Sequence, residues 1–215
     1  MDKSALKKKQ KFESYQVGES TSHRDIISRQ RKKVLPRVGL LTMGYFEYWR
    51  MYDGLATEVS NLMKHIADRM AESDSYELIY PGFVDDYPKA EKAAKLFVDK
   101  QVDLLVFVEG TYFPDYIPFY VKRQLEHVPI LIYSTQSFKH INPKFGYRDI
   151  LRDSGLVGLI QLTGAFSKVG WRYDVLLGHV DDDEIYRQIE IHAEVIGCVK
   201  ALKSLKVGID RKSVV

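Results

Sequence analysis

The segment Met43–Arg50 combines aromatic and charged side chains directly after a short run of aliphatic residues. Its aromatic members are Tyr45, Phe46, Tyr48 and Trp49. Aromatic faces beside polar groups suit a sugar, whose C–H faces stack on rings while its hydroxyls form hydrogen bonds. The segment is therefore a candidate binding loop for a polyhydroxylated ligand. A lid over a sheet edge or a subunit interface would use the same residue types.

A second candidate segment, Glu109–Pro114, begins at the end of the most hydrophobic run of the chain and contains Tyr112. The Glu109 carboxyl could serve as a general acid, as a general base or as an acceptor for a ligand hydroxyl. A carboxylate that lies near a helix N-terminus, where the helix dipole favours it, would look the same in the sequence. Both interpretations stay open at this point.

Three polar residues, Ser134, Thr135 and Gln136, follow a further aliphatic run. Their hydroxyl and amide groups could bind the hydroxyls of a ligand, although Ser and Thr also form local hydrogen bonds in turns. The acidic run at residues 181–184 has the composition of a metal site. Acidic residues also favour the N-terminal end of a helix, so we expect helix capping there.

Several familiar motifs are missing from the sequence. There is no GxGxxG after the first expected strand and no GxxxxGK[ST], so dinucleotide-binding and P-loop proteins are not favoured. Gly155 and Gly158 are expected inside a helix, where they serve packing or capping. No CxxC, HExxH or paired His spacing occurs, so a self-contained metal site is not expected. The single cysteine excludes an internal disulfide bond and fits a reducing compartment.

Strands and helices are expected to alternate from residue 37 onward, and this alternation positions the candidate segments. Short aliphatic runs predict buried strands, and apolar residues at helical spacing predict helices between them. The expected strands are Val38–Thr42, Tyr76–Tyr80, Leu104–Val108, Pro129–Tyr133, Tyr173–Leu177 and Lys206–Ile209. The expected helices cover residues 55–70, 89–99, 115–126 and 154–166, and a long segment after residue 183 with Ile185, Ile189, Val199 and Leu202 on one face. Residues 134–153 are expected to be irregular.

Hydrophobic strands without polar alternation, separated by helices, indicate a parallel sheet covered on both faces. We therefore expect an α/β fold of three layers with a doubly wound, mainly parallel sheet of the Rossmann or flavodoxin-like kind. Ligands of such sheets bind in the crevice at the carboxyl ends of the strands. The three candidate segments all follow strands, so they should meet at that edge.

Charge divides the chain into parts. Residues 1–36 hold ten Lys/Arg and four Asp/Glu, whereas the remainder holds twenty-two and twenty-five. We expect a basic, disordered leader at residues 1–36, an α/β domain at residues 37–205, and the truncated start of a second α/β domain at residues 206–215. A basic leader could contact nucleic acid or an anionic membrane, but a solvated leader is the simpler interpretation, so neither partner is expected. No apolar run is long enough to span a membrane.

Four sequence blocks occur in a fixed order along the chain: VGLLTM with GYFEYW, LLVFVEGTYFP, ILIYSTQ, and GLIQLTGAF with YDVLLGHVDD before a long helix. In order and spacing they resemble the N-terminal domain of the L-arabinose/L-fucose isomerase-like family, over about residues 37–210. The resemblance implies a Rossmann-like domain of a cytoplasmic homo-oligomer that interconverts aldoses and ketoses with a divalent metal, usually manganese. The family's Glu and His metal ligands lie in later domains, so Mn²⁺ is expected only for a full-length enzyme, with no cofactor in this chain.

In the family, the N-terminal domain closes over the substrate site of a neighbouring subunit. The resemblance therefore implies substrate-covering roles for the loop Tyr45–Trp49, for Tyr112 and for Ser134–Gln136, with a pentose or a 6-deoxyhexose as the ligand. Arabinose isomerases tend to have HTQ where this chain has Ser134-Thr135-Gln136, which points to a divergent branch with another sugar. A role for Glu109 as a second carboxylate is an additional hypothesis.

The sequence thus predicts the substrate-covering and oligomerisation domain of a metal-dependent aldose–ketose isomerase, inactive on its own. Two other functions stay open. One is a stand-alone sugar-binding module without chemistry, and the other is an oligomerisation domain whose aromatic loop packs against a partner.

Overall fold

The computed structural model describes residues 35–205, and these residues belong to one unit that begins at Leu35. The expected basic leader at residues 1–36, apart from its last two residues, lies outside the described part. The expected strand Lys206–Ile209 and the expected second domain at residues 206–215 lie outside it as well. The described fold is therefore that of the α/β domain expected at residues 37–205.

All strands of the sheet run parallel, in the order β2-β1-β4-β5-β6, and the short β3 pairs with the end of β1. Their bounds are β1 (Arg37–Met43), β2 (Glu77–Ile79), β3 (Phe83–Val84), β4 (Leu104–Glu109), β5 (Ile130–Gln136) and β6 (Tyr173–His179). With β3 left aside, this is the flavodoxin-like order, in which the winding of the chain reverses between β1 and β4. The structure confirms the expected three-layer, doubly wound α/β fold.

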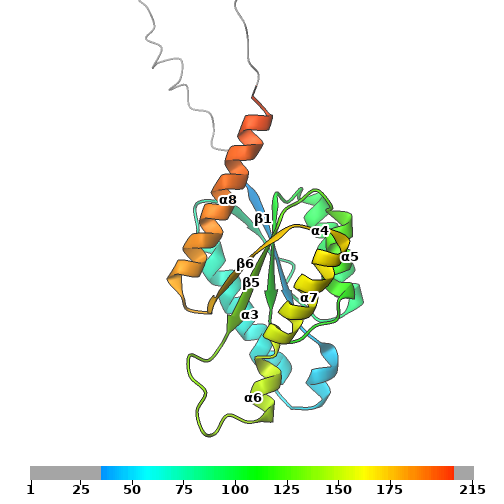
Figure 1. Ribbon diagram of the computed structural model, residues 1–215, viewed down its shortest axis with the longest axis vertical. Coiled ribbons are helices and arrows are strands. Elements are labelled where there is room, and N and C mark those ends of the chain that lie inside the picture. Colours follow the sequence, from blue (N-terminus) through cyan, green and yellow to red (C-terminus); the bar gives the residue numbers. More distant parts are fainter. Residues whose placement is uncertain (1–34, 206–215) are drawn as a thin grey trace, which may run out of the picture. The chain divides into compact units, whose positions relative to one another are not determined.

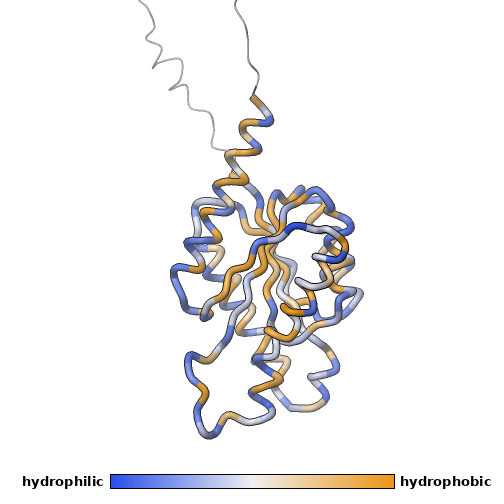
Figure 2. The backbone as a smooth tube through the Cα atoms, viewed as in Figure 1, coloured by the Kyte–Doolittle hydropathy of each residue, from blue (hydrophilic) through white to orange (hydrophobic). Residues whose placement is uncertain are grey.

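Two layers of helices cover the sheet (Figure 1). The helices α3 (Leu55–Ala71) and α8 (Asp183–Lys203) pack on one face, and α4 (Tyr87–Asp99), α5 (Tyr116–Gln124) and α7 (Gly155–Val169) pack on the other. The β4 side chains alternate accordingly: Leu105 and Phe107 contact the α4–α5–α7 layer, whereas Val106 and Val108 contact the α3–α8 layer. Figure 2 shows the resulting concentration of apolar residues in the central strands. The short α6 (Tyr147–Arg152) and the 3₁₀ helix η1 (Phe46–Arg50) lie at the carboxyl edge of the sheet.

The segment after β5 is more regular than its sequence predicts. The residues Ser134–Gln136, expected in a loop, belong to β5, because the strand continues its pairing with β6 as far as Gln136. Residues 147–152, expected to be irregular, form α6, and the Asp149 carboxylate closes its first turn by accepting a hydrogen bond from the Gly146 N–H at 2.9 Å. The short β3 is also absent from the expected elements, since two residues are too few to produce a pattern.

The long α8 helix departs from expectation in its second half. Its first half buries Ile185 and Ile189 against the sheet, as expected. The prediction that Val199 and Leu202 share this buried face is wrong: both are exposed, because the helix continues beyond the end of the sheet (Figure 1). Among the described residues, no helix combines the length and the apolar composition that a membrane span requires.

Candidate functional site

The carboxyl ends of β1 and β4 lie side by side at the point where the winding of the sheet reverses. Met43 and Glu109, the last residues of the two strands, pair across the ladder, and the Gly110 N–H donates to the Met43 carbonyl at 2.7 Å. The loops that follow therefore begin next to each other. Doubly wound sheets hold their ligands in the crevice at this position, so the two loops form the centre of the candidate site.

Four aromatic residues from the two loops form one group, which we call the tyrosine cluster: Tyr45, Phe46, Tyr48 and Tyr112. The Tyr45 ring lies at its centre, with centroid distances of 5.6 Å to Phe46, 5.3 Å to Tyr48 and 5.8 Å to Tyr112, all in edge-to-face geometry. The Tyr45 N–H also donates to the Thr111 hydroxyl at 3.2 Å, which joins the two loops. All four residues are half-buried, so ring surface is available to a ligand.

Trp49, expected to belong to the same aromatic platform, lies in a different group of contacts. Its indole N–H donates to the Asp85 carboxylate at 2.7 Å, and its ring centroid lies 5.9 Å from that of Phe83. Asp85 in turn pairs with the Lys89 ammonium. Trp49 therefore anchors η1 to the segment after β3 and does not extend the tyrosine cluster.

Glu109 is buried below the surface of this edge. It is 2% exposed, and neither carboxylate oxygen has a hydrogen-bond partner among the described residues. Burial raises the pKa of the Glu109 carboxyl to about 8, and the neighbouring Ser134 hydroxyl opposes this effect only in part. Glu109 is therefore mostly protonated at neutral pH, and its carboxyl group can donate a hydrogen bond as well as accept one.

The close approach of α7 is what covers Glu109. A Cβ atom on Gly155 would lie 2.9 Å from the Glu109 Cβ and 3.0 Å from the Glu109 carbonyl oxygen. A Cβ atom on Gly158 would lie 2.6 Å from the Phe113 ring. The two glycines thus let the first turns of α7 pack directly on the end of β4, which confirms the expectation that they serve packing.

An open cleft of about 770 Å³ lies between the ends of β5 and β6 and the start of α7. Ser134, Gln136 and Leu156 line it. Ser134 and Gln136 project from the same face of the sheet as Glu109, because side chains alternate along neighbouring strands in register. Thr135 projects from the opposite face, so only two of the three polar residues selected at this strand end reach the cleft. The sequence does not identify the other lining residues as ligand-binding, and these include Phe138, Lys139, Leu177, His179 and the acidic turn 181–183.

Ser154 connects the tyrosine cluster to the start of α7. Ser154 directly precedes α7, but its hydroxyl does not cap the helix. The hydroxyl instead accepts a hydrogen bond from the Tyr112 N–H at 2.8 Å and donates to the Leu151 carbonyl at 2.7 Å. Burial raises the pKa of the Tyr48 phenol, and its contact with Ser154 opposes this effect. The start of α7 thus contacts the tyrosine cluster through Ser154 and lines the cleft through Leu156.

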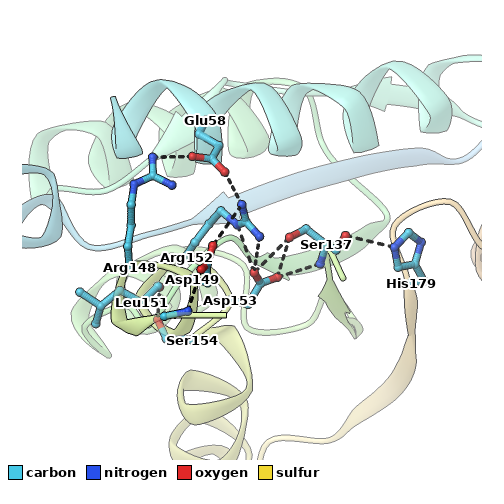
Figure 3. A network of polar contacts seen from close by, with 10 residues as sticks. Glu58, Ser137, Arg148, Asp149, Leu151, Arg152, Asp153, Ser154 and His179 are labelled. Carbon is cyan, nitrogen blue, oxygen red and sulfur yellow. Dashed lines mark hydrogen bonds and ion pairs between the residues drawn. The ribbon is translucent and has the colours of Figure 1, made fainter. Parts of the chain in front are cut away.

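A charged network, drawn in Figure 3, fixes α6 to α3. Glu58 of α3 accepts hydrogen bonds from Arg148, at 2.6 Å, and from Arg152. Arg152 also donates to the Asp153 carboxylate at 3.1 Å. Burial raises the pKa of Glu58, but the two arginines outweigh it, so this pKa is lowered and the carboxylate is ionised at neutral pH.

The network continues from Asp153 to the cleft (Figure 3). The Asp153 carboxylate accepts hydrogen bonds from the Ser137 N–H at 2.7 Å and from the Ser137 hydroxyl at 2.9 Å, and the Ser137 carbonyl lies 3.3 Å from the His179 Nε2 atom. The Arg152 guanidinium stacks over Phe138, 3.9 Å from its ring centroid. These contacts hold one wall of the cleft. The expectation that residues 134–153 are irregular left this wall unpredicted. The opposite charges of Asp149 and Arg152 at i, i+3 spacing are the signal for α6 that the sequence does contain.

Replacing Glu58 with Gln should release α6. The variant removes the negative charge that accepts hydrogen bonds from Arg148 and Arg152, and a hydrogen bond to a charged group contributes about 1.5–3 kcal/mol. Arg152 keeps its contact with Asp153, so α6 should loosen while the rest of the fold stays intact. We expect faster hydrogen exchange and faster proteolytic cleavage across residues 137–153 than in the wild type. Glu91→Gln, at an exposed position on α4, is the matched control and should change neither rate. Wild-type rates in Glu58→Gln would show that other contacts hold the segment.

The described residues do not fit a bound metal. Residues 35–205 contain no group of three or more His, Cys, Asp or Glu side chains that could hold a metal ion. The acidic turn begins α8, where the Asp182 carboxylate accepts a hydrogen bond from the Glu184 N–H at 3.1 Å, so the expected capping role is confirmed. No step through a metal is therefore assigned to this domain.

Comparison with known proteins adds no family assignment. The chain matches no protein-family model, and no curated protein matches it significantly. The candidate site is thus defined by its geometry: a tyrosine cluster, a buried carboxyl group and an open cleft at the carboxyl edge of a flavodoxin-like sheet.

Proposed function

We propose that the tyrosine cluster and the adjoining cleft bind a monosaccharide, and that the domain covers the substrate in a metal-dependent aldose–ketose isomerase of the L-arabinose/L-fucose isomerase-like family. The observation that carries this proposal is the position of the tyrosine cluster. It lies where the winding of the sheet reverses, with polar groups of the next strands beside it. The family itself rests on the four sequence blocks that resemble its N-terminal domain.

The chemical character of the two surfaces supports a neutral ligand that is rich in hydroxyls. Half-buried rings offer faces for the C–H groups of a sugar, and Ser134 and Gln136 offer donors and acceptors for its hydroxyls. Glu109, mostly protonated at neutral pH, adds little negative charge to this edge of the sheet. The acidic turn 181–183 at the cleft disfavours a phosphorylated sugar, because like charges repel.

In this proposal, the isomerisation takes place outside the described residues. Moving a proton between adjacent sugar carbons needs an acid–base group, and in the family a divalent metal, expected to be Mn²⁺, polarises the two oxygens. Residues 35–205 provide no ligand set for it, so the domain's part is to cover and orient the sugar. The resemblance and the single cysteine support a cytoplasmic enzyme.

Titration of the chain with pentoses and 6-deoxyhexoses, followed by amide NMR, tests the proposal. We expect weak, saturable shifts at the amides of residues 45, 112 and 136. Tyr112→Ala should weaken the binding about two- to twelvefold, because a stacked ring contributes about 0.5–1.5 kcal/mol. Tyr87→Ala, which removes an exposed ring on α4, is the control and should bind as the wild type does.

The outcomes separate the competing functions. An absence of amide shifts with every sugar would contradict a sugar-binding surface at this edge. An affinity that Tyr112→Ala leaves unchanged would mean that the sugar binds elsewhere on the chain. The alternative function, a stand-alone sugar-binding module, predicts tight binding by this chain alone. A substrate-covering domain supplies only one wall of a site, so its own affinity should be low.

A further inference from the structure

The free edge of the sheet carries an apolar surface that no described helix covers. β6 pairs only with β5, so the backbone groups along its outer edge have no partner strand within residues 35–205. Val175 and Leu177 of β6 are 37% and 65% exposed, and Leu156 and Ile160 of α7 are 45% and 70% exposed. We call these four residues the apolar shelf.

The strand residues of the apolar shelf face the same side of the sheet as α7. Tyr173, at the start of β6, projects toward α7, where its hydroxyl lies 3.0 Å from the Ser167 hydroxyl and donates to the Thr163 carbonyl at 3.2 Å. Val175 and Leu177 share the face of Tyr173 because side chains alternate along a strand. Both nevertheless remain exposed, since α7 packs over β4 and β5 and leaves this part of β6 uncovered.

The helix residues of the apolar shelf complete the same surface. Leu156 and Ile160 precede Thr163 at the i, i+4, i+7 spacing of one helix flank, the flank that Tyr173 contacts. Leu156 and Leu177 also line the cleft together. The apolar shelf is therefore one continuous surface beside an unpaired strand. Edge strands of monomers commonly carry a proline or charged residues, above all lysine, that prevent pairing. Residues 173–179 contain no lysine or proline, and the exposed Asp174 projects from the face opposite the apolar shelf.

Charge along this edge indicates what covers it. Lys168 and Arg172 lie exposed at the amino end of β6, and neither forms an ion pair within residues 35–205. The acidic turn 181–183 lies exposed at the carboxyl end. Asp181 contacts His65 and Asp183 pairs with Arg69, but three carboxylates face one arginine, so the turn remains negatively charged. Two antiparallel copies of β6 would bring the basic end of each strand beside the acidic end of the other, whereas a parallel pair would bring like charges together. The edge is thus complementary to a second copy of itself.

We propose that the chain forms a two-fold symmetric homodimer in which the β6 strands of two copies pair antiparallel and join the two sheets edge to edge. A two-fold axis near Leu177 uses the same patch on both subunits, as a closed dimer requires. It also packs each copy's apolar shelf against that of the other. The dimer does not depend on the proposed sugar site, but it places Arg172 of each copy at the acidic turn that lines the other copy's cleft.

Sedimentation equilibrium of the chain over a range of concentrations tests this dimer. We expect a reversible monomer–dimer equilibrium, which Leu177→Lys should weaken by about tenfold or more, because it removes apolar contact and places two like charges near the axis. Leu202→Lys, at a leucine of α8 with a similar exposure of 69%, is the control and should dimerise as the wild type does. A monomeric wild type, or a dimer that Leu177→Lys leaves intact, would overturn the proposal.

Charge exchange distinguishes antiparallel pairing from a folding defect. One variant combines Lys168→Glu with Arg172→Glu, and the other is Asp181→Lys, which leaves the ion pair between Arg69 and Asp183 in place. Each variant alone should dimerise more weakly than the wild type, because like charges then meet at both ends of the paired strands. An equimolar mixture should regain dimerisation, since opposite charges meet at both ends of the mixed dimer. A mixture that dimerises no better than its components would contradict the antiparallel arrangement.

Discussion

The Glu109 carboxyl should lower the free energy of unfolding by about 3–4 kcal/mol between pH 5 and pH 8, and Glu109→Gln should remove this contribution. Burial raises the pKa of Glu109 from 4.5 to about 8, and neither carboxyl oxygen has a hydrogen-bond partner among the described residues. Below pH 4.5 the carboxyl is protonated in both the folded and the unfolded chain, so its contribution to stability is complete. As the pH rises, the unfolded chain loses the proton first, and the contribution is lost progressively until the pH passes about 8.

Urea unfolding at several pH values between 5 and 8 measures this effect. The difference in free energy of unfolding between the wild type and Glu109→Gln isolates the carboxyl, because glutamine has nearly the same shape and does not titrate. The exposed Glu126 supplies the control: Glu126→Gln should follow the wild-type pH profile. Parallel profiles for the wild type and Glu109→Gln would mean that the Glu109 carboxylate is ionised and solvated in the folded protein.

The same burial shapes the proposed chemistry of the site. A change of 3–4 kcal/mol is a large fraction of the stability of an ordinary domain, so an unpartnered carboxyl group at this position is a costly feature. A sugar hydroxyl bound next to Ser134 would provide part of the polar environment that the Glu109 carboxyl lacks. Sugar binding should therefore reduce the pH dependence of stability, which links the stability measurement to the NMR titration.

Local sequence patterns sufficed for the fold and for part of the site. Aliphatic runs predicted β1, β4 and β5, and the rule that ligands bind at the carboxyl ends of parallel strands placed Tyr45, Tyr112 and Ser134 at one edge. The strand order was not predictable, because it depends on which face of the sheet each connecting helix covers. The observed order brings the β1 and β4 loops together, and hence forms the tyrosine cluster.

Contacts between segments that are far apart in the chain could not be predicted from the sequence. The indole N–H of Trp49 reaches a carboxylate 36 residues away, and Glu58 binds arginines 90 and 94 residues away. No local period encodes such pairs, so Trp49 was grouped with its aromatic neighbours and the network around α6 went unpredicted. The orientation of Thr135 was unpredictable for a different reason. Its sequence did not show that β5 continues through residue 136, and within a strand Thr135 projects from the face opposite Ser134.

Leu162→Ala should lower the free energy of unfolding by about 2–5 kcal/mol, whereas Leu156→Ala should lower it by less than about 1 kcal/mol. Both leucines lie on α7, but Leu162 is fully buried and Leu156 is 45% exposed. Leu162 packs in the core layer beside Phe166, so its truncation would leave a cavity. Urea unfolding of the two variants under identical conditions, at concentrations where the chain is monomeric, measures the difference.

The comparison tests which side of α7 faces the sheet, a point that its sequence leaves open. Apolar residues occupy nearly every side of the helix, so periodicity cannot rank Leu156 below Leu162. Equal losses in the two variants would mean that α7 is rotated or that its outer flank is covered in the monomer. A large loss for Leu162→Ala alone would confirm the orientation that leaves the apolar shelf exposed. That exposed flank is the surface on which the proposed dimer depends.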